Sequence, residues 1–154
     1  MNNDSNITKQ IFLTATLLEK KGDVVFSAFG LTIKTHEILM LIQEGVCTTK
    51  ELAQKMSLKP AGITQKTKVL EKNGFISRKV KKSDMRSWKF VLTTKGTETL
   101  GKTFPINEKV FKRLYSSFSE SEKNIVSKVL IEVIEHLDKL TDSQIREFIS
   151  NNRS

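Results

Sequence analysis

Residues 48–95 contain, in order, the local patterns of a helix, a turn, a second helix and a two-stranded hairpin. Thr48-Thr49-Lys50-Glu51 is a capping box, which predicts a short helix to about Met56. Pro60 at a first helical position and Gly74 just past the last turn predict a helix over residues 60–73. Residues 75–80 and 87–92 alternate apolar and polar around the polar loop 81–86. The order predicts a helix-turn-helix followed by a small β wing.

The same stretch holds all the excess positive charge of the chain. Residues 48–95 contain thirteen lysines and arginines against three acidic residues, a net +10, while the whole chain carries +9. A helix-turn-helix places one helix in the major groove of DNA, and neighbouring basic side chains neutralise phosphates. We therefore interpret the chain as a winged-helix DNA-binding protein, mainly α with a small β wing.

Composition sets the broad class of the protein. A length of 154 residues suits one domain, and 38% apolar residues suffice for a core. The sole cysteine, Cys47, cannot form an internal disulfide and fits a reducing cytoplasm. The longest apolar run, residues 38–42, is too short to span a bilayer. We expect a cytoplasmic protein with no membrane partner.

Helical patterns flank the basic stretch on both sides. Apolar residues recur at helical spacing from Ile7 until Gly22 offers a stop, and a second helix runs from a Thr32 cap to Gly45. A long helix begins after Thr93, and Pro105 is expected to kink or interrupt it. Capping boxes at residues 119–122 and 141–144 start two more helices. Both ends of the chain are more apolar than a monomer needs to bury, which predicts a dimer interface.

The helix over residues 60–73 is the candidate recognition helix. A helical wheel places Ile63, Thr67 and Leu70 on one side, and the opposite side is short, polar and basic. That outward set consists of Ala61, Thr64, Gln65, Lys68 and Lys72. A glutamine amide can hydrogen-bond an adenine edge, and a threonine hydroxyl can bond a base or a phosphate. An alanine methyl group can touch a thymine methyl group, and the lysines can bind phosphates. The alternative is a basic helix face that is only solvated.

The wing adds a second group of candidate DNA contacts. Its basic residues surround Asp84, whose carboxylate can hold the Arg86 guanidinium for entry into a minor groove. They are Lys79, Lys81, Lys82 and Arg86. The alternative is a turn-forming Asp84 with Arg86 as its surface partner. Thr48, Thr49 and Lys50 add a helix start that can contact phosphate.

Taken together, several short motifs resemble the MarR (multiple antibiotic resistance regulator) family. The matching residues are Leu31-Thr32, Thr49 to Ala53, Ile63-Thr64, Leu70 to Ile76, Arg78, Asp84-Met85-Arg86-Ser87 and Leu92-Thr93-Thr94-Lys95-Gly96. The resemblance covers about residues 7–142 and adds Ser87 to the candidate DNA contacts. In two departures, Met85 replaces an arginine frequent in the wing motif, and Lys66 with Thr67 makes the recognition helix more polar than usual.

The resemblance implies one domain over residues 1–154, with dimerisation helices at about 7–30 and 104–150 and a DNA-binding lobe at about 31–103. It further implies a homodimer that binds a pseudo-palindromic operator in double-stranded DNA, often as a repressor. Relatives commonly respond to small aromatic acids, oxidants or metals in a cleft beside the DNA-binding lobe. Candidate pocket residues are Phe12, Phe29, His36, Met40 and Phe104, although apolar residues at this spacing are more often core.

Other functions lack supporting motifs. His36 and His136 are the only histidines and form no metal-ligand spacing, so we expect no metal and no cofactor. Cys47 is expected to be structural rather than an oxidation sensor. No phosphate-binding glycine loop or nucleophile–base arrangement suggests an enzyme. The rival function is a winged-helix module that binds RNA or a protein partner without operator specificity.

Overall fold

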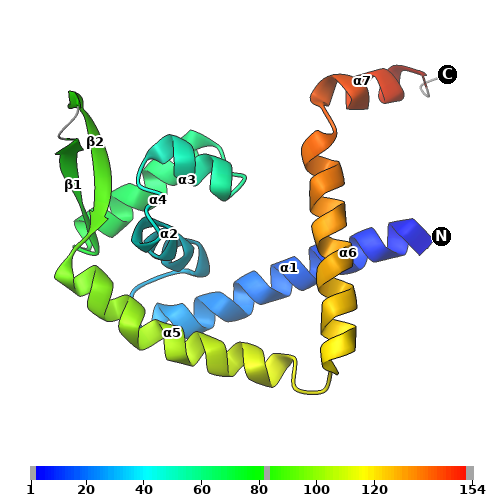
Figure 1. The fold of residues 1–154 in the computed structure, drawn as a ribbon, viewed down its shortest axis with the longest axis horizontal. Helices are drawn as coiled ribbons and strands as arrows, with labels where there is room; N and C mark the ends of the chain where they lie inside the picture. The colour runs from blue at the N-terminus through cyan, green and yellow to red at the C-terminus, as the bar shows by residue number, and fades with distance from the viewer. Residues whose placement is uncertain (1–2, 82–83, 152–154) are drawn as a thin grey trace. The chain divides into compact units, whose positions relative to one another are not determined.

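The computed structural model describes residues 3–81 and 84–151, and the side chains of residues 81–87 lie outside this description. The described residues are mainly helical with one antiparallel two-stranded sheet, as the sequence predicted (Figure 1). Its elements are α1 (Asn3–Ser27), α2 (Ile33–Gln43), α3 (Thr49–Lys55), α4 (Pro60–Lys72), β1 (Ile76–Lys81), β2 (Asp84–Leu92), α5 (Thr94–Leu114), α6 (Glu120–Lys139) and α7 (Asp142–Asn151). The chain divides into two compact units, residues 1–108 and residues 109–154, which are described separately.

The helix-turn-helix follows from its capping residues. The Thr48 hydroxyl accepts the Glu51 amide at 3.2 Å, and the Glu51 carboxylate accepts the Thr48 amide at 2.9 Å. This confirmed capping box starts α3, and Ser57, at φ 51°, turns the chain after it. Pro60 then begins α4. Proline is suited to this position because an amide in the first helical turn has no partner within the helix, and proline has no amide hydrogen to donate.

The core of the first unit lies where α2, α3 and α4 meet the base of the hairpin. Leu39, Leu52, Ile63 and Phe90 come from these four elements and have no exposed surface. Burial of each such side chain contributes about 1.5–3 kcal/mol to the free energy of unfolding. The Phe90 amide also donates to the Cys47 carbonyl at 2.8 Å, which joins β2 to the segment before α3. The hairpin is therefore anchored at its base.

The hairpin is longer than the sequence predicted. Its register runs from Ile76 opposite Leu92 to Val80 opposite Trp88, and it becomes irregular between Val80 and Lys81. β2 begins at Asp84, inside the segment 81–86 that was predicted to be loop. The prediction was wrong there because strand pairing uses backbone groups, whereas alternation is visible only where one face of the strands is buried.

The start of α5 is tied to the end of α4. The Thr93 hydroxyl accepts the Gly96 amide at 3.1 Å and donates to the Gly74 carbonyl at 2.6 Å. Lys95 Nζ donates to the Asn73 carbonyl at 2.8 Å. A Cβ on Gly96 would collide with the Phe75 carbonyl oxygen, so this close approach requires glycine. These contacts hold the C-terminal end of α4 in place.

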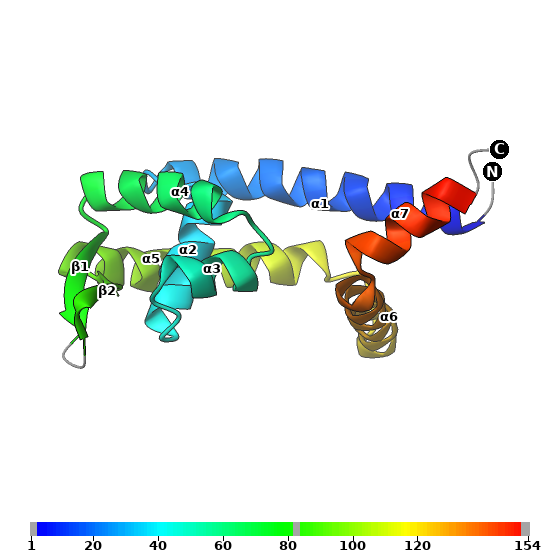
Figure 2. The same cartoon turned by 90° about the horizontal axis from the view of Figure 1, so that it is seen from above.

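Two helices continue through residues that were expected to end or break them. Gly22 lies inside α1, where a Cβ would come within 2.5 Å of the Ile33 side chain, so its role is packing rather than termination. Pro105 lies inside α5, which Figure 2 shows as one uninterrupted helix. Its ring removes one amide donor, and the exposed position of Gly101, four residues earlier, leaves that carbonyl open to water. The helix is therefore not interrupted at Pro105, and a kink there stays a prediction.

The second unit exposes most of its apolar side chains. The Ser119–Glu122 capping box that starts α6 is confirmed, and Thr141 caps α7 through Gln144. Neither helix has a buried residue. The most exposed large apolar side chains on them are Ile125, Ile134, Leu137 and Phe148. Among the described residues, no helix is long and apolar enough to cross a membrane.

Candidate nucleic-acid interface

The outer face of α4 has the composition predicted for a recognition helix. Ile63, Thr67 and Leu70 are buried, which confirms the predicted inner side of the helix. Four members of the predicted outward set are exposed: Ala61, Gln65, Lys68 and Lys72. The exposed face therefore offers an amide, a methyl group and two cations to a partner.

Two threonines of α4 have hydroxyls that are already engaged. Thr64 is half-buried and its hydroxyl donates to the Pro60 carbonyl at 2.9 Å, so in this rotamer its oxygen can only accept from a partner. The buried Thr67 hydroxyl donates to the Thr64 carbonyl at 3.2 Å. Thr67 is thus a core residue whose hydroxyl is hydrogen-bonded within the helix. It therefore adds no polar group to the outer face of α4.

The start of α3 has fewer free donors than its sequence suggests. Thr48 and Thr49 are half-buried, and the Glu51 carboxylate takes the amides of Cys47 and Thr48 at 3.1 and 2.9 Å. Lys50 is exposed and supplies the positive charge at this end of the helix.

On the hairpin, two lysines face each other. Lys79 on β1 lies directly opposite Lys89 on β2, and both are exposed. Lys89 was not among the predicted contacts, because its pairing with Lys79 depends on the strand register. The sequence feature that could have identified Lys89 is the alternation of β2, which puts Lys89 on the face opposite Trp88 and Phe90. Directly opposed like charges repel, so the pair forms a local site of positive potential.

The hairpin also carries an arginine whose charge is neutralised. Arg78 Nε and Nη2 donate to the two carboxylate oxygens of Glu71 on α4, each at 2.8 Å. The guanidinium carbon lies 4.2 Å from the centroid of the Trp88 ring. Arg78 therefore joins α4 to the wing instead of offering a free cation.

Five predicted wing contacts fall where the structure gives no side chains. Lys82 lies outside the described residues, and so do the side chains of Lys81, Asp84, Arg86 and Ser87. The predicted contact between Asp84 and Arg86 stays a prediction.

The comparisons with known proteins agree with this geometry. A sequence model of the MarR family matches residues 31–88, the segment that contains α3, α4 and most of the hairpin. The chain therefore resembles the MarR family over its helix-turn-helix and most of its hairpin. The family is one of transcriptional regulators and not of enzymes.

Individual MarR-family and related proteins match over most of the chain. The transcriptional repressor YetL of Bacillus subtilis is 28% identical over 86% of this chain and 84% of its own. The crystal structure of a MarR/EmrR-family regulator from Acinetobacter sp. ADP1 has a TM-score of 0.82 at 22% identity, covering 91% of this chain and all of that one. The MepR protein of S. aureus, solved in complex with DNA, has a TM-score of 0.78 at 19% identity, covering 88% and 99% of the two chains.

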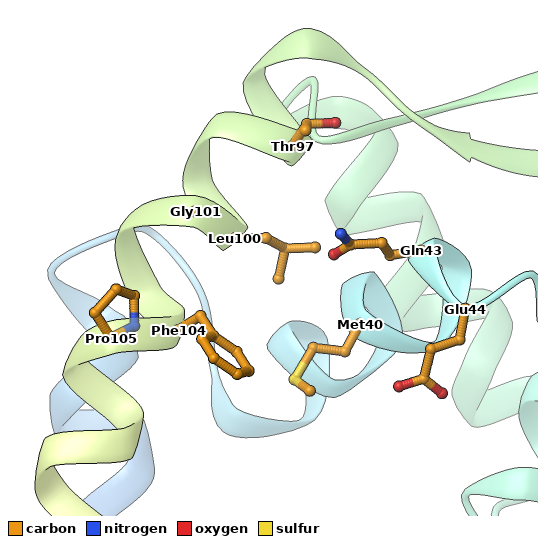
Figure 3. Close-up of a pocket in the computed structure, with 8 residues that line it drawn as sticks. All are labelled: Met40, Gln43, Glu44, Thr97, Leu100, Gly101, Phe104 and Pro105. Atoms are coloured by element: carbon orange, nitrogen blue, oxygen red, sulfur yellow. The ribbon is translucent and has the colours of Figure 1, made fainter.

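The first unit also has a cleft between α2 and α5. The cleft has a volume of about 600 Å³. Figure 3 shows the residues that line it. Met40 and Gln43 of α2 and its C-cap residue Glu44 line one side, and Thr97, Leu100, Gly101, Phe104 and Pro105 of α5 line the other. Two of the predicted pocket residues, Met40 and Phe104, are in this lining.

The other predicted pocket residues lie elsewhere. Phe29 packs against the core, and Phe12 is 70% exposed on α1. His36 is buried, with its ring stacked on Phe26 at a centroid distance of 4.0 Å and its Nε2 2.9 Å from the Thr103 hydroxyl. Burial lowers the pKa of His36 from 6.5 to about 4, so the ring is neutral at pH 7. Among the described residues, no cluster of His, Cys, Asp and Glu side chains could hold a metal ion.

Proposed function

We propose that this protein is a sequence-specific regulator of transcription that binds double-stranded DNA as a homodimer, recognises an inverted repeat and acts as a repressor. The exposed basic face of α4, beside a basic hairpin, carries this proposal. The structure of MepR with DNA supports the same use of this fold here. The proposed location is the cytoplasm, where the operator would be reached.

The proposed roles of the individual residues follow from the chemistry of their side chains. Gln65 and Ala61 on the exposed face of α4 would contact base edges in the major groove, since an amide can bond adenine and a methyl group can touch thymine. Lys68 and Lys72 lie on the same face and would contact phosphates. The wing would enter the adjacent minor groove through Arg86.

Homodimerisation is supported by the exposed apolar surface of the second unit. α6 and α7 have no buried residue, and an apolar surface of this kind on a soluble protein marks an interaction site. A second copy is the proposed occupant, because twofold symmetry repeats the recognition helix and predicts two half-sites about one helical turn apart.

Repression and its release are the finer parts of the proposal. YetL is a repressor, which supports repression rather than activation by this protein. The cleft between α2 and α5 would bind a small, largely apolar effector, with the Gln43 and Glu44 side chains as its polar contacts. An effector bound there would release the operator by displacing α5 relative to α2.

Selection of duplexes from a random DNA library by the purified protein, followed by sequencing, tests the function directly. The expected result is an enriched inverted repeat, bound with an affinity that falls steeply with salt. Salt-sensitive binding without any enriched sequence would contradict operator recognition. That result would favour the rival function, a winged-helix module for RNA or a protein partner.

A further inference from the structure

We infer that Glu71, Arg78 and Trp88 form a clasp that sets the position of the wing relative to α4, so that the Lys79–Lys89 pair binds a DNA phosphate at a fixed distance from the recognition helix. This inference rests on the proposed function and names two positioning residues, Glu71 and Arg78, and one phosphate site. The clasp and the lysine pair lie on opposite faces of the same hairpin.

The clasp connects three elements through one guanidinium group. Arg78 on β1 makes two parallel hydrogen bonds of 2.8 Å to Glu71 on α4. The same group lies over Trp88 of β2 at 4.2 Å and within 5.7 Å of the Phe90 ring centroid. Trp88 and Phe90 meet edge to face, with centroids 4.8 Å apart. Only a planar guanidinium can pair in this forked way and stack on a ring at the same time.

The charges of Glu71 and Arg78 fit a role in positioning the wing rather than in binding DNA. Glu71 is one of only three acidic residues among residues 48–95. It neutralises the one arginine of β1, so Arg78 contributes little free charge for a phosphate. An acidic residue on the proposed DNA-binding surface opposes binding by simple electrostatics, and its structural contact with Arg78 explains its presence there.

Strand alternation then places the phosphate site. Because Arg78 faces α4, the next residue, Lys79, points to the other side of the hairpin. Its direct partner across the strands is Lys89. Two lysines at opposed positions repel each other until an anion lies between them, and a DNA phosphate is the anion this protein would meet. Rotation of the hairpin about its base would move this pair away from the DNA, and the clasp opposes that rotation.

Glu71→Gln and Arg78→Lys test the clasp in the full-length protein. The probes are the duplex that the wild type enriches from a random library and an unselected duplex of equal length. Glu71→Gln adds one unit of net positive charge, so electrostatics alone predicts tighter binding. The clasp predicts the opposite, a loss of about tenfold in affinity for the selected duplex, as for one good DNA contact. Arg78→Lys keeps the charge and should show the same loss.

The slope of log affinity against log salt is a readout that a loss of stability alone would not change, and the emission of the sole tryptophan is compared only among variants that remain folded. A lost phosphate contact lowers the slope of log affinity against log salt by about 0.9. The variants should show that reduction while remaining folded by circular dichroism. Trp88 is the chain's only tryptophan, and its emission should shift to longer wavelength when the guanidinium leaves the ring. The exposed Glu98 on α5 offers a matched control, since Glu98→Gln makes the same charge change away from the hairpin.

The double variant Lys79→Ala/Lys89→Ala decides whether the clasp acts through the lysine pair. It should reduce affinity by itself, and adding Glu71→Gln should then cause no further loss. An additive loss would overturn the inference, as would a Glu71→Gln protein that binds as tightly as the wild type with an unchanged salt slope. A wild type with no salt-sensitive DNA binding would overturn the proposed function itself.

Discussion

The buried histidine of α2 predicts a specific loss of stability in acid. His36 is 3% exposed, stacks on Phe26 and is hydrogen-bonded to Thr103, with no acidic side chain among these contacts. Its pKa is lowered from 6.5 to about 4 by burial. The folded protein therefore holds the ring neutral at a pH where the unfolded chain binds a proton. The contribution to stability is complete above pH 6.5 and is lost as the pH falls toward 4.

The size of the effect follows from these two pKa values. Proton linkage predicts that His36 lowers the free energy of unfolding by about 1.3 kcal/mol between pH 7.5 and 5.5, and by about 2.5 kcal/mol between pH 7.5 and 4.5. Below pH 4 the loss levels off, because the folded state then takes up the proton as well. Carboxylates titrate in part of the same range, so the measurement must isolate the histidine.

Urea unfolding of the wild type and His36→Gln at several pH values provides that isolation. Protein concentration is held constant, because the stability of a dimer depends on it. Glutamine keeps an amide donor for Thr103 but does not titrate, so the difference between the two proteins should shrink as the pH falls. Parallel pH profiles for the wild type and His36→Gln would refute the reasoning.

Three further predictions concern the DNA contacts, the packing and the assembly. Arg86→Ala should weaken binding to the selected duplex by about 1–3 kcal/mol in a mobility-shift titration, and an unchanged affinity would remove the wing tip from recognition. Gly96→Ala should lower the thermal unfolding midpoint, because its Cβ would collide with the Phe75 carbonyl, whereas Gly62→Ala in α4 has open space and should raise it through helix propensity; equal midpoints for the two variants would contradict this account. The protein should sediment as a dimer at micromolar concentration, and truncation before α6 should abolish the dimer; a monomeric full-length protein would refute the assembly.

The elements were predictable where local chemistry decides the backbone. The Thr48–Glu51 capping box, Pro60 and the apolar side of α4 each act within one or two helical turns, and the structure has them as predicted. Gly22 misled the prediction because tertiary packing decides its place, and Pro105 because its exposed position leaves the carbonyl four residues earlier open to water. Gly22 accommodates the side chain of Ile33, and Pro105 lies in a helix that continues past it.

The site was predictable only in part. The outward face of α4 follows from helical periodicity, so Gln65, Lys68 and Lys72 could be named from the sequence. The contact of Arg78 with Glu71 and the position of Lys89 opposite Lys79 could not, because they depend on the strand register and on which helix the hairpin packs against. His36 was assigned to a pocket, yet it lies in the core against Phe26 and Thr103, which is 67 residues away in the chain.

The sequence by itself determined the order of the elements, the inner and outer faces of α4 and the concentration of positive charge in residues 48–95. Each of these is a property of near neighbours, since capping, helical periodicity and net charge need no knowledge of the rest of the chain. Only the tertiary structure decided that Glu71 neutralises the charge of Arg78. It also decided that Lys79 lies opposite Lys89 and that His36 is buried as a neutral ring. These depend on contacts between residues distant in sequence, whose partners are chosen by the packing of the whole core.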